Sequence, residues 1–317
     1  MLRFFKINNG LIENIPKDDG HFSIMHKDAD WIDVNEPDEE ERRQLRVLLR
    51  TDLPESDDVE EIEASARCFV DQVGIHVHSL FLTQSEGRHK TSTVACILQK
   101  DRLVTVREAE IADFRLLSMR ARGGQIAADS PAQLLVTMLE HKVENHADTL
   151  EDLHRQLEEV SHLVLEENET ELDTVIEKLA RLEDSNGKIR LCLTDTQRDI
   201  SFLLRHLRSK QDHSETLREI MRDVDTLMSH TTFLFDKINF LMDSTQGFIN
   251  IEQNKIIKIF SIAAVVFLPP TLVASIYGMN FHVMPELHWS LGYPGALGLM
   301  VASAFAPYWY FKHRGWL

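Results

Sequence analysis

Two long apolar stretches near the C-terminal end of the chain are its clearest hydrophobic feature. The first runs from about residue 259 to 277 and the second over 291–311, and neither contains a charged residue. A helix needs roughly 20 apolar residues to cross a hydrocarbon core about 30 Å thick. The sequence therefore predicts transmembrane helices over 259–280 and 291–311, joined by a loop over 281–290.

Basic residues flank the two apolar stretches only at their outer ends. Lys255 and Lys258 precede the first stretch, Lys312 and Arg314 follow the second, and the predicted loop has no Lys or Arg. Segments rich in Lys and Arg next to membrane helices stay in the cytoplasm. We therefore expect both termini in the cytoplasm, with a basic tail over 312–317, and the loop on the outer side.

Before about residue 125 the hydrophobic pattern mixes strand and helix signals. Alternating or continuous apolar runs predict strands at 31–34, 68–73, 75–83, 93–98 and 103–106. Helical patterns lie near 39–49, 59–66 and 111–122. We expect a cytoplasmic α/β domain over 1–125, with a mixed sheet.

A helical hairpin is predicted over 126–212. Asp129 or Ser130 can cap a helix that has Pro131 at its first position. Apolar residues then recur with a seven-residue pattern in two runs, separated by a polar turn over 166–170. The first run is Val143, Leu150, Leu153, Leu157, Val160 and Val164, and the second is Val175, Leu179, Leu182, Ile189, Leu193, Ile200, Leu203 and Leu207. Such a pair of helices is typical of an antiparallel scaffold.

No strong helix breaker occurs between about residue 214 and the Pro269-Pro270 pair. The sequence therefore predicts a long stalk helix, with a cytoplasmic part over 213–258 that continues into the first membrane span. Counting back from Asn280 by threes and fours selects one face of this helix, which we call the long-helix stripe. Besides Asn280 it contains Thr271, Leu268, Ala264, Phe260, Ile257, Gln253, Asn250, Gln246 and Asp243.

The long-helix stripe has two interpretations. It can be an ordinary surface that faces solvent in the cytoplasm and lipid in the membrane. It can also line a pore, in which a polar vestibule leads to an apolar collar that gates by losing its water. The collar consists of Ile257, Phe260, Ala264 and Leu268. Two helices per chain cannot enclose an aqueous path, so a pore requires several identical chains around a cyclic axis.

The Pro269-Pro270 pair removes two backbone donors from the predicted membrane helix. The carbonyls of Val265 and Val266 thereby lose their usual helical partners. In hydrocarbon these carbonyls need water, a neighbouring helix or a side chain such as that of Thr271. Water in a pore is the simplest supply, and a neighbouring helix is the alternative.

Composition excludes several classes of function. The formal net charge is −17, which is unsuited to binding nucleic acid. The acidic clusters serve solubility, or bind divalent cations if the membrane part handles cations. The cysteines lack metal-ligand spacing and are expected to be reduced thiols. His76 and His78 share a face of a predicted strand and fit a packed or surface pair better than a metal site.

The chain also lacks the phosphate-binding, metalloprotease and hydrolase motifs that carry common enzymatic chemistry. An enzyme is therefore the least favoured class. The tripeptide Gly278-Met279-Asn280 ends the first predicted span, and taken alone it fits a simple helix cap, since Gly and Asn tolerate the left-handed conformation.

Several motifs together resemble the CorA family of magnesium transport proteins. The signature Gly-Met-Asn stands at 278–280, preceded by Tyr277 and followed by Met-Pro-Glu-Leu at 284–287. The segment 248–254, Phe-Ile-Asn-Ile-Glu-Gln-Asn, leads into the span, and 60–67 and 190–193 also resemble the proteobacterial branch. The resemblance thus covers nearly the whole chain.

The resemblance implies a homopentameric funnel in a bacterial inner membrane that carries Mg²⁺ inward passively, with Co²⁺ and Ni²⁺ as secondary ions. Its partners would be further copies of itself, membrane lipid and divalent cations. A ring of Asn280 side-chain carbonyls could bind hydrated Mg²⁺ weakly enough for release. Gly278 would permit the turn that directs Asn280 to the axis, and Met279 would pack behind it.

One position departs from the family pattern. His282 stands where the family often has an acid, which leaves Glu286 as the one acid in the predicted loop. We expect cation attraction at this mouth to weaken below about pH 6.5, where histidines gain charge.

Intracellular Mg²⁺ is also expected to regulate the assembly by bridging carboxylates between subunits. Asp243 lies on the long-helix stripe, and Asp223 and Asp225 are candidates for an interfacial site, although a solvated face explains them too. Two other functions remain open: a zinc or nickel/cobalt transporter of the same fold, and a membrane-anchored helical scaffold without transport. Intact Met279 favours magnesium.

Overall fold

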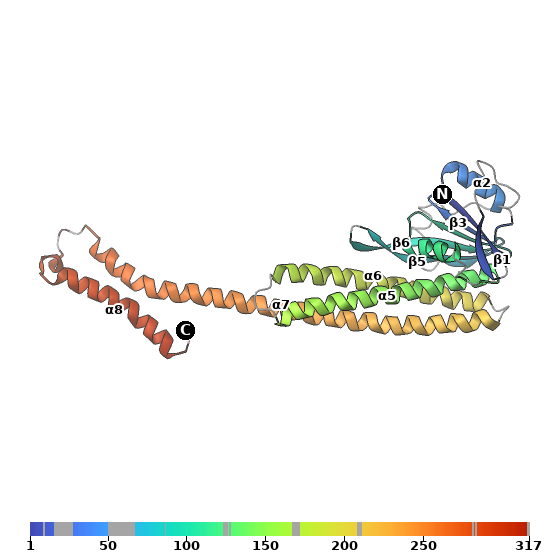
Figure 1. The fold of residues 1–317 in the computed structure, drawn as a ribbon. Helices are drawn as coiled ribbons and strands as arrows, with labels where there is room; N and C mark the ends of the chain where they lie inside the picture. The colour runs from blue at the N-terminus through green and yellow to red at the C-terminus, as the bar shows by residue number, and fades with distance from the viewer. Residues whose placement is uncertain are drawn as a thin grey trace. The chain divides into compact units, whose positions relative to one another are not determined.

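The structure is a computed structural model that describes residues 1–8, 10–15, 28–49, 67–85, 87–122, 126, 128–166, 172–207, 211–280, 282 and 284–315. It divides into two compact units, Met1–Met242 and Asp243–Leu317. The first unit contains a sheet and helices around a shared core, and the second contains the apolar C-terminal part of the chain (Figure 1).

The first unit contains a seven-stranded sheet with the order β2-β1-β3-β7-β6-β5-β4. The strands are β1 (Leu2–Asn8), β2 (Leu11–Ile15), β3 (Trp31–Asn35), β4 (Cys68–Val70), β5 (Ile75–Ser85), β6 (Arg88–Leu98) and β7 (Leu103–Arg107). The pair β3 and β7 is parallel, with Trp31 opposite Leu103, and the other described pairs are antiparallel. The prediction of an α/β domain with a mixed sheet is confirmed.

Strand β4 ends earlier than the predicted strand over 68–73. The Asp71 side chain accepts hydrogen bonds from the backbone N–H groups of Val73 (2.8 Å) and Gly74 (3.0 Å). Such a local turn competes with strand pairing. Strand β5 begins at the residue after Gly74 and pairs there with Leu98. The backbone of Gly74 therefore lies close to that strand, and a Cβ at Gly74 would stand 2.2 Å from the Leu98 carbonyl oxygen. The predicted helix over 59–66 lies outside the described residues.

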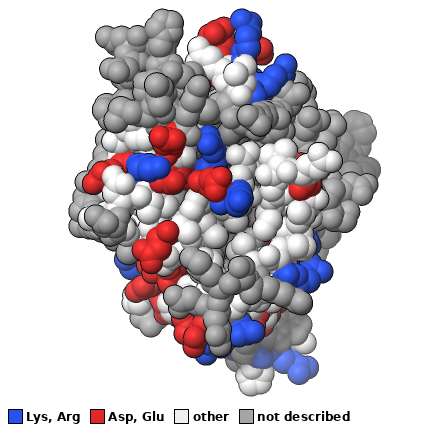
Figure 2. Space-filling model, turned by 90° about the vertical axis from the view of Figure 1, so that its right-hand side faces the viewer, with Lys and Arg blue, Asp and Glu red and all other residues white. Residues whose placement is uncertain are grey.

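Two helices of the α/β region agree with the sequence pattern. They are α2 (Glu39–Leu49) and α4 (Ala112–Arg122). The acidic cluster at the start of α2 has structural partners: Glu41 pairs with the N-terminal amine at 3.0 Å, and Glu40 pairs with Arg43 at 3.1 Å. Acids in a first helical turn also complement the helix dipole. Acidic and basic side chains are interspersed on the face shown in Figure 2.

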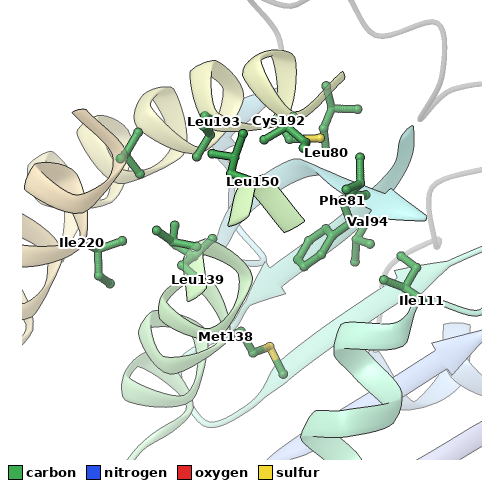
Figure 3. Close-up of a cluster of buried hydrophobic side chains, with 14 of the residues drawn as sticks. Leu80, Phe81, Val94, Ile111, Met138, Leu139, Leu150, Cys192, Leu193 and Ile220 are labelled. Carbon is green, nitrogen blue, oxygen red and sulfur yellow. The ribbon is translucent and has the colours of Figure 1, made fainter. Parts of the chain in front are cut away.

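The predicted hairpin consists of α5 (Pro131–Glu166) and α6 (Leu172–His206). Ser130 is the cap, because its hydroxyl accepts a hydrogen bond from the Gln133 N–H at 3.3 Å. The heptad residues of both helices are buried in one hydrophobic cluster with strand residues such as Leu80, Phe81 and Val94 (Figure 3). The exception is Leu207, which follows the end of α6 and is only partly buried. The first part of α7 (Gln211–Tyr277) adds Ile220 and its neighbours to this cluster.

A network of hydrogen bonds between buried polar side chains joins the hairpin to strand β5. Lys142 of α5 donates a hydrogen bond to the Ser79 hydroxyl at 2.7 Å, and that hydroxyl donates to Asp199 of α6 at 2.5 Å. Asp195 accepts from the Leu80 N–H at 2.6 Å and pairs with Arg67 at 3.3 Å. Burial raises the pKa of Asp199 to about 7. The carboxylates of Asp195 and Asp199 therefore both have hydrogen-bond partners inside the core.

The second unit contains the end of α7, a short 3-10 helix η1 (Pro285–His288) and α8 (Gly292–His313). Helix α7 continues through Pro269 and Pro270. Among the described residues, α7 alone has a stretch long and apolar enough to cross a membrane, and that stretch is not buried inside the structure. Helix α8 is where the second span is predicted, and that span stays a prediction.

Candidate ion pathway and cation sites

The long-helix stripe lies on α7 and is exposed along its whole length in the single chain. Its large apolar members are each more than half exposed: Ile257 is 61% exposed, Phe260 71% and Leu268 66%. Exposed apolar surface of this extent marks an interaction with lipid, a ligand or another protein. The structure thus leaves this face of α7 available for contacts outside the chain.

The less exposed residues of the same segment lie on the opposite side of the helix. Ile262, Val266, Pro269, Val273 and Tyr277 are half-buried and recur every three or four residues. On an α-helix these positions fall about 180° from Ala264 and its neighbours on the stripe. The unit therefore shields one side of α7 and leaves the stripe side bare.

The hydroxyl of Thr271 does not donate a hydrogen bond to the carbonyls that the two prolines leave without partners. It donates a hydrogen bond to the Phe267 carbonyl oxygen at 2.7 Å. The suggested contact from Thr271 to Val265 or Val266 is therefore corrected: the hydroxyl reaches back four residues, as is usual for threonine in a helix. Water and a neighbouring helix remain as the two candidate hydrogen-bond partners of these carbonyls.

Gly278 ends α7 without a left-handed turn. Its N–H donates to the Ala274 carbonyl oxygen at 2.9 Å, and the Met279 N–H donates to that of Ile276 at 3.3 Å. Neither Gly278 nor Asn280 has a positive φ angle. The interpretation as a left-handed cap is thus wrong. Glycine matters here through close approach, since a Cβ at Gly278 would stand 3.1 Å from the Ala274 oxygen.

The remaining signature residues lie at the surface of the second unit. Asn280 is exposed, and Met279 is 50% exposed in the single chain. The packing of Met279 behind Asn280 stays a prediction. His282 and His288 are exposed as well. The backbone of Glu286 belongs to η1, and its side chain lies outside the described residues.

The three candidate regulatory aspartates do not converge within one chain. Asp243 is exposed on the stripe. Asp225 accepts a hydrogen bond from the Gln197 amide at 2.8 Å, so it faces α6. Asp223 instead lines a hollow of about 260 Å³ between α5 and α7, together with Glu140 and Glu144.

Glu140 and Glu144 are acidic neighbours of Asp223 that sequence reasoning missed. Burial raises the pKa of Glu140, and the charges of Glu144, Glu219 and Asp223 raise it further. Glu140, Glu144 and Asp223 therefore repel one another around this hollow, and the nearby Glu219 adds to the negative charge. The four-residue spacing of Glu140 and Glu144 indicates that the two acids share one face of α5. It does not indicate their proximity to Asp223, which lies about 80 positions later in the sequence, on α7.

No preformed metal site occurs in the described part of the chain: nowhere there do three His, Cys, Asp or Glu side chains come together around one point. His76 and His78 are both buried, and His76 stacks on Phe69 with ring centres 4.4 Å apart. The interpretation of a packed pair is confirmed. The cysteines are free thiols, and burial raises the pKa of Cys96 to about 12 and that of Cys192 to about 11.

Comparison with known proteins gives concordant results. Residues 26–313 match the model of a family described as CorA-like Mg2+ transporter protein. The chain is 45% identical over the full length of both chains to the magnesium transport protein CorA of Escherichia coli (strain K12), and equally to that of Yersinia pseudotuberculosis. The complete structure of the CorA magnesium transporter from Methanocaldococcus jannaschii superposes with a TM-score of 0.76 at 20% identity, covering 100% of this chain and 99% of that one.

Proposed function

The chain belongs to the family of CorA-like Mg²⁺ transporter proteins, and from this premise we propose that it is a passive Mg²⁺ influx channel of a bacterial inner membrane. The observation that carries the proposal is the bare stripe on α7, which ends at the exposed Asn280. A helix face that is polar at one end and apolar at the other fits a vestibule followed by a collar. The half-buried residues on the opposite side leave the stripe free to face an axis.

Several chains must contribute to such a pathway. One chain offers a single copy of the stripe, and a cyclic homo-oligomer would surround an axis with identical copies. The family resemblance points to five copies in a funnel-shaped assembly. The exposed apolar side chains of Ile257, Phe260 and Leu268 would then form the collar, and their contact with neighbouring chains would remove much of their surface from water.

The membrane arrangement follows from the charges around the two apolar stretches. In the proposed topology the end of α7 and α8 span the bilayer, and both termini lie in the cytoplasm. Lys255 and Lys258 precede the first span, and Lys312 and Arg314 follow the second. Their long side chains would contact lipid headgroups on the cytoplasmic side.

A ring of Asn280 side chains would select the ion at the outer mouth. Mg²⁺ gives up its water reluctantly, so neutral amide oxygens would accept hydrogen bonds from the water shell of the intact hydrated ion. The membrane potential would drive entry, since two charges moving through 100 mV release about 4.6 kcal/mol. Co²⁺ and Ni²⁺ would pass as secondary ions.

Intracellular Mg²⁺ would act as the regulatory ligand. Asp223 and Asp243 are exposed on α7 and available to a neighbouring chain, whereas Asp225 is engaged by Gln197 within the chain. Mg²⁺ between subunits would offset carboxylate repulsion and hold the assembly closed, and depletion would release it. Neutral substitution of Asp223, Asp225 and Asp243 should raise influx at high internal Mg²⁺; unchanged feedback inhibition would remove these residues from the gate.

Mg²⁺ influx into proteoliposomes, with internal Mg²⁺ varied, tests the proposal. Asn280→Ala should abolish influx while the oligomer keeps its size on gel filtration. Ser290→Ala is the matched control, because it removes an exposed polar group near the same mouth, and it should transport normally.

Indifference of influx to Asn280→Ala would support a scaffold without transport. Faster flux of Zn²⁺, Ni²⁺ or Co²⁺ than of Mg²⁺ in the wild-type protein would instead support the rival transporter for softer metals.

A further inference from the structure

Two histidines that are not part of the long-helix stripe face each other across the helices of the first unit. His154 lies on α5 and His230 lies on α7, and their ring centres are 5.8 Å apart with an angle of 46° between the ring planes. Phe233 lies beside both rings, at 6.1 Å from His154 and 6.3 Å from His230. The pair thus joins two helices that are distant in sequence.

The separation of the rings fits two ligands of one metal ion. A ring nitrogen binds such an ion at about 2.1 Å, which places the ion about 3.2 Å from the ring centre. Two imidazoles on one tetrahedral ion then have centres about 5.2 Å apart, and wider angles give up to about 6.4 Å. The observed 5.8 Å lies between these values.

The surroundings of the pair favour a cation. The Nδ1 atom of His154 is buried without a hydrogen-bond partner. The Nε2 atom of the same ring lies 3.7 Å from a carboxylate oxygen of Glu158. Glu158 is also bonded to Lys237, which lowers its pKa, so it carries negative charge beside the pair.

His230 is suited to remain uncharged at neutral pH. Burial lowers the pKa of His230, and the neighbouring His154 lowers it further. A neutral imidazole is the form that binds metal. No third His, Cys, Asp or Glu completes a site among the described residues, so water would fill the remaining positions.

We propose that His154 and His230 form a binding site for a first-row divalent transition-metal cation, which joins α5 to α7 through two ring nitrogens. Imidazole suits Ni²⁺, Co²⁺ and Zn²⁺, whereas Mg²⁺ prefers oxygen ligands and does not compete for such a pair. The site lies wholly within the first unit. It does not rest on the proposed transport function, because binding here needs no ion to cross a membrane.

Calorimetric titration with NiCl₂ tests the proposal on the tag-free, full-length protein in detergent and millimolar Mg²⁺. His154→Gln and His230→Gln should each remove the same single binding event per chain. His141→Gln is the matched control, since His141 lies on α5 next to Glu144 and outside the pair, and it should leave that event intact.

Thermal unfolding gives a second readout that does not depend on calorimetry. Ni²⁺ should raise the unfolding temperature of the wild-type protein and of His141→Gln, and should leave that of the two pair variants unchanged. A ligand that binds only the folded state stabilises it by mass action, so the shift should grow with Ni²⁺ concentration.

Three outcomes would overturn the proposal. Ni²⁺ binding that survives in both His154→Gln and His230→Gln would place the ion elsewhere, and loss of binding in His141→Gln as well would indicate adventitious surface binding only. Displacement of Ni²⁺ by millimolar Mg²⁺ would indicate an oxygen-ligand site. A variant that fails to fold would be recognised by its circular dichroism, and the remaining single variant and the wild-type Mg²⁺ competition would still decide the question.

Discussion

Lys142→Met would test whether the buried charge network holds the hairpin on the sheet. Lys142 is fully buried, donates a hydrogen bond to Ser79 at 2.7 Å, and has its Nζ 4.6 Å from the ring centre of Phe81. Methionine keeps a flexible apolar stem of similar length and removes the charge. Asp199, which Lys142 reaches through the Ser79 hydroxyl, would then lose the cation that lowers its pKa. Removing one charge from a buried, compensated network costs up to about 3–5 kcal/mol.

The loss should depend on pH in a defined direction. Burial raises the pKa of Asp199 to about 7, and Lys142 is the first of the groups that hold it down. A carboxyl with a raised pKa keeps its proton in the folded state after the unfolded state has released it, so the free energy of unfolding falls as pH rises towards that pKa and is level above it. Without Lys142 the pKa of Asp199 rises further, so the free energy of unfolding continues to fall up to a higher pH.

Hydrogen–deuterium exchange of the β5 and α5 amides measures the free energy of opening this region. The difference between wild type and Lys142→Met should be larger at about pH 8.5 than at about pH 6.5, by about 1.4 kcal/mol for each unit of pKa rise. Lys188→Met removes a partly exposed ion pair with Asp184, 2.6 Å long, and should cost no more than about 1 kcal/mol. Equal losses for the two variants, or a loss independent of pH, would refute the reasoning.

Further predictions concern the sheet and the outer mouth. Arg107→Met should destabilise the first unit by about 3–5 kcal/mol in chemical denaturation, because it leaves the buried Asp33 without its 3.0 Å partner; a loss below about 1 kcal/mol would contradict this. Gly74→Ala should lower the yield of folded protein, since its Cβ would stand 2.2 Å from the Leu98 oxygen, whereas Gly87→Ala meets no neighbouring atom there and tests only the positive φ of 73°. His282→Glu should raise Mg²⁺ influx, because it adds a carboxylate at an exposed position of the proposed outer mouth; influx no greater than that of the wild type would argue against it.

Most helices and buried strands could be predicted from the sequence because their apolar periodicity is regular. Strands β1 and β2 were missed for physical reasons. In β1 the consecutive residues Phe4 and Phe5 are both buried, one on each face of the sheet, so no alternation marks the strand. In β2 only Ile12 is buried, as expected for an edge strand with one anchoring side chain.

The candidate site could be predicted only where it lies along a single helix. The long-helix stripe has a local period, and the structure shows its members sharing one exposed face of α7. The grouping of Asp223 with Glu140 and Glu144 depends on how α5 packs beside α7, which no local pattern encodes. The same holds for the pair of His154 and His230, and for the backbone conformation of Gly278.

The bare apolar face of α7 also constrains how the protein is made. Transfer of a fully exposed Leu, Ile or Phe side chain out of water gains about 1.5–3 kcal/mol, and Ile257, Phe260 and Leu268 are each more than half exposed in the lone subunit. A newly synthesised chain that did not insert into the bilayer would aggregate with other copies through these side chains. Under the proposed topology we therefore expect each chain to insert into lipid before it assembles with other copies.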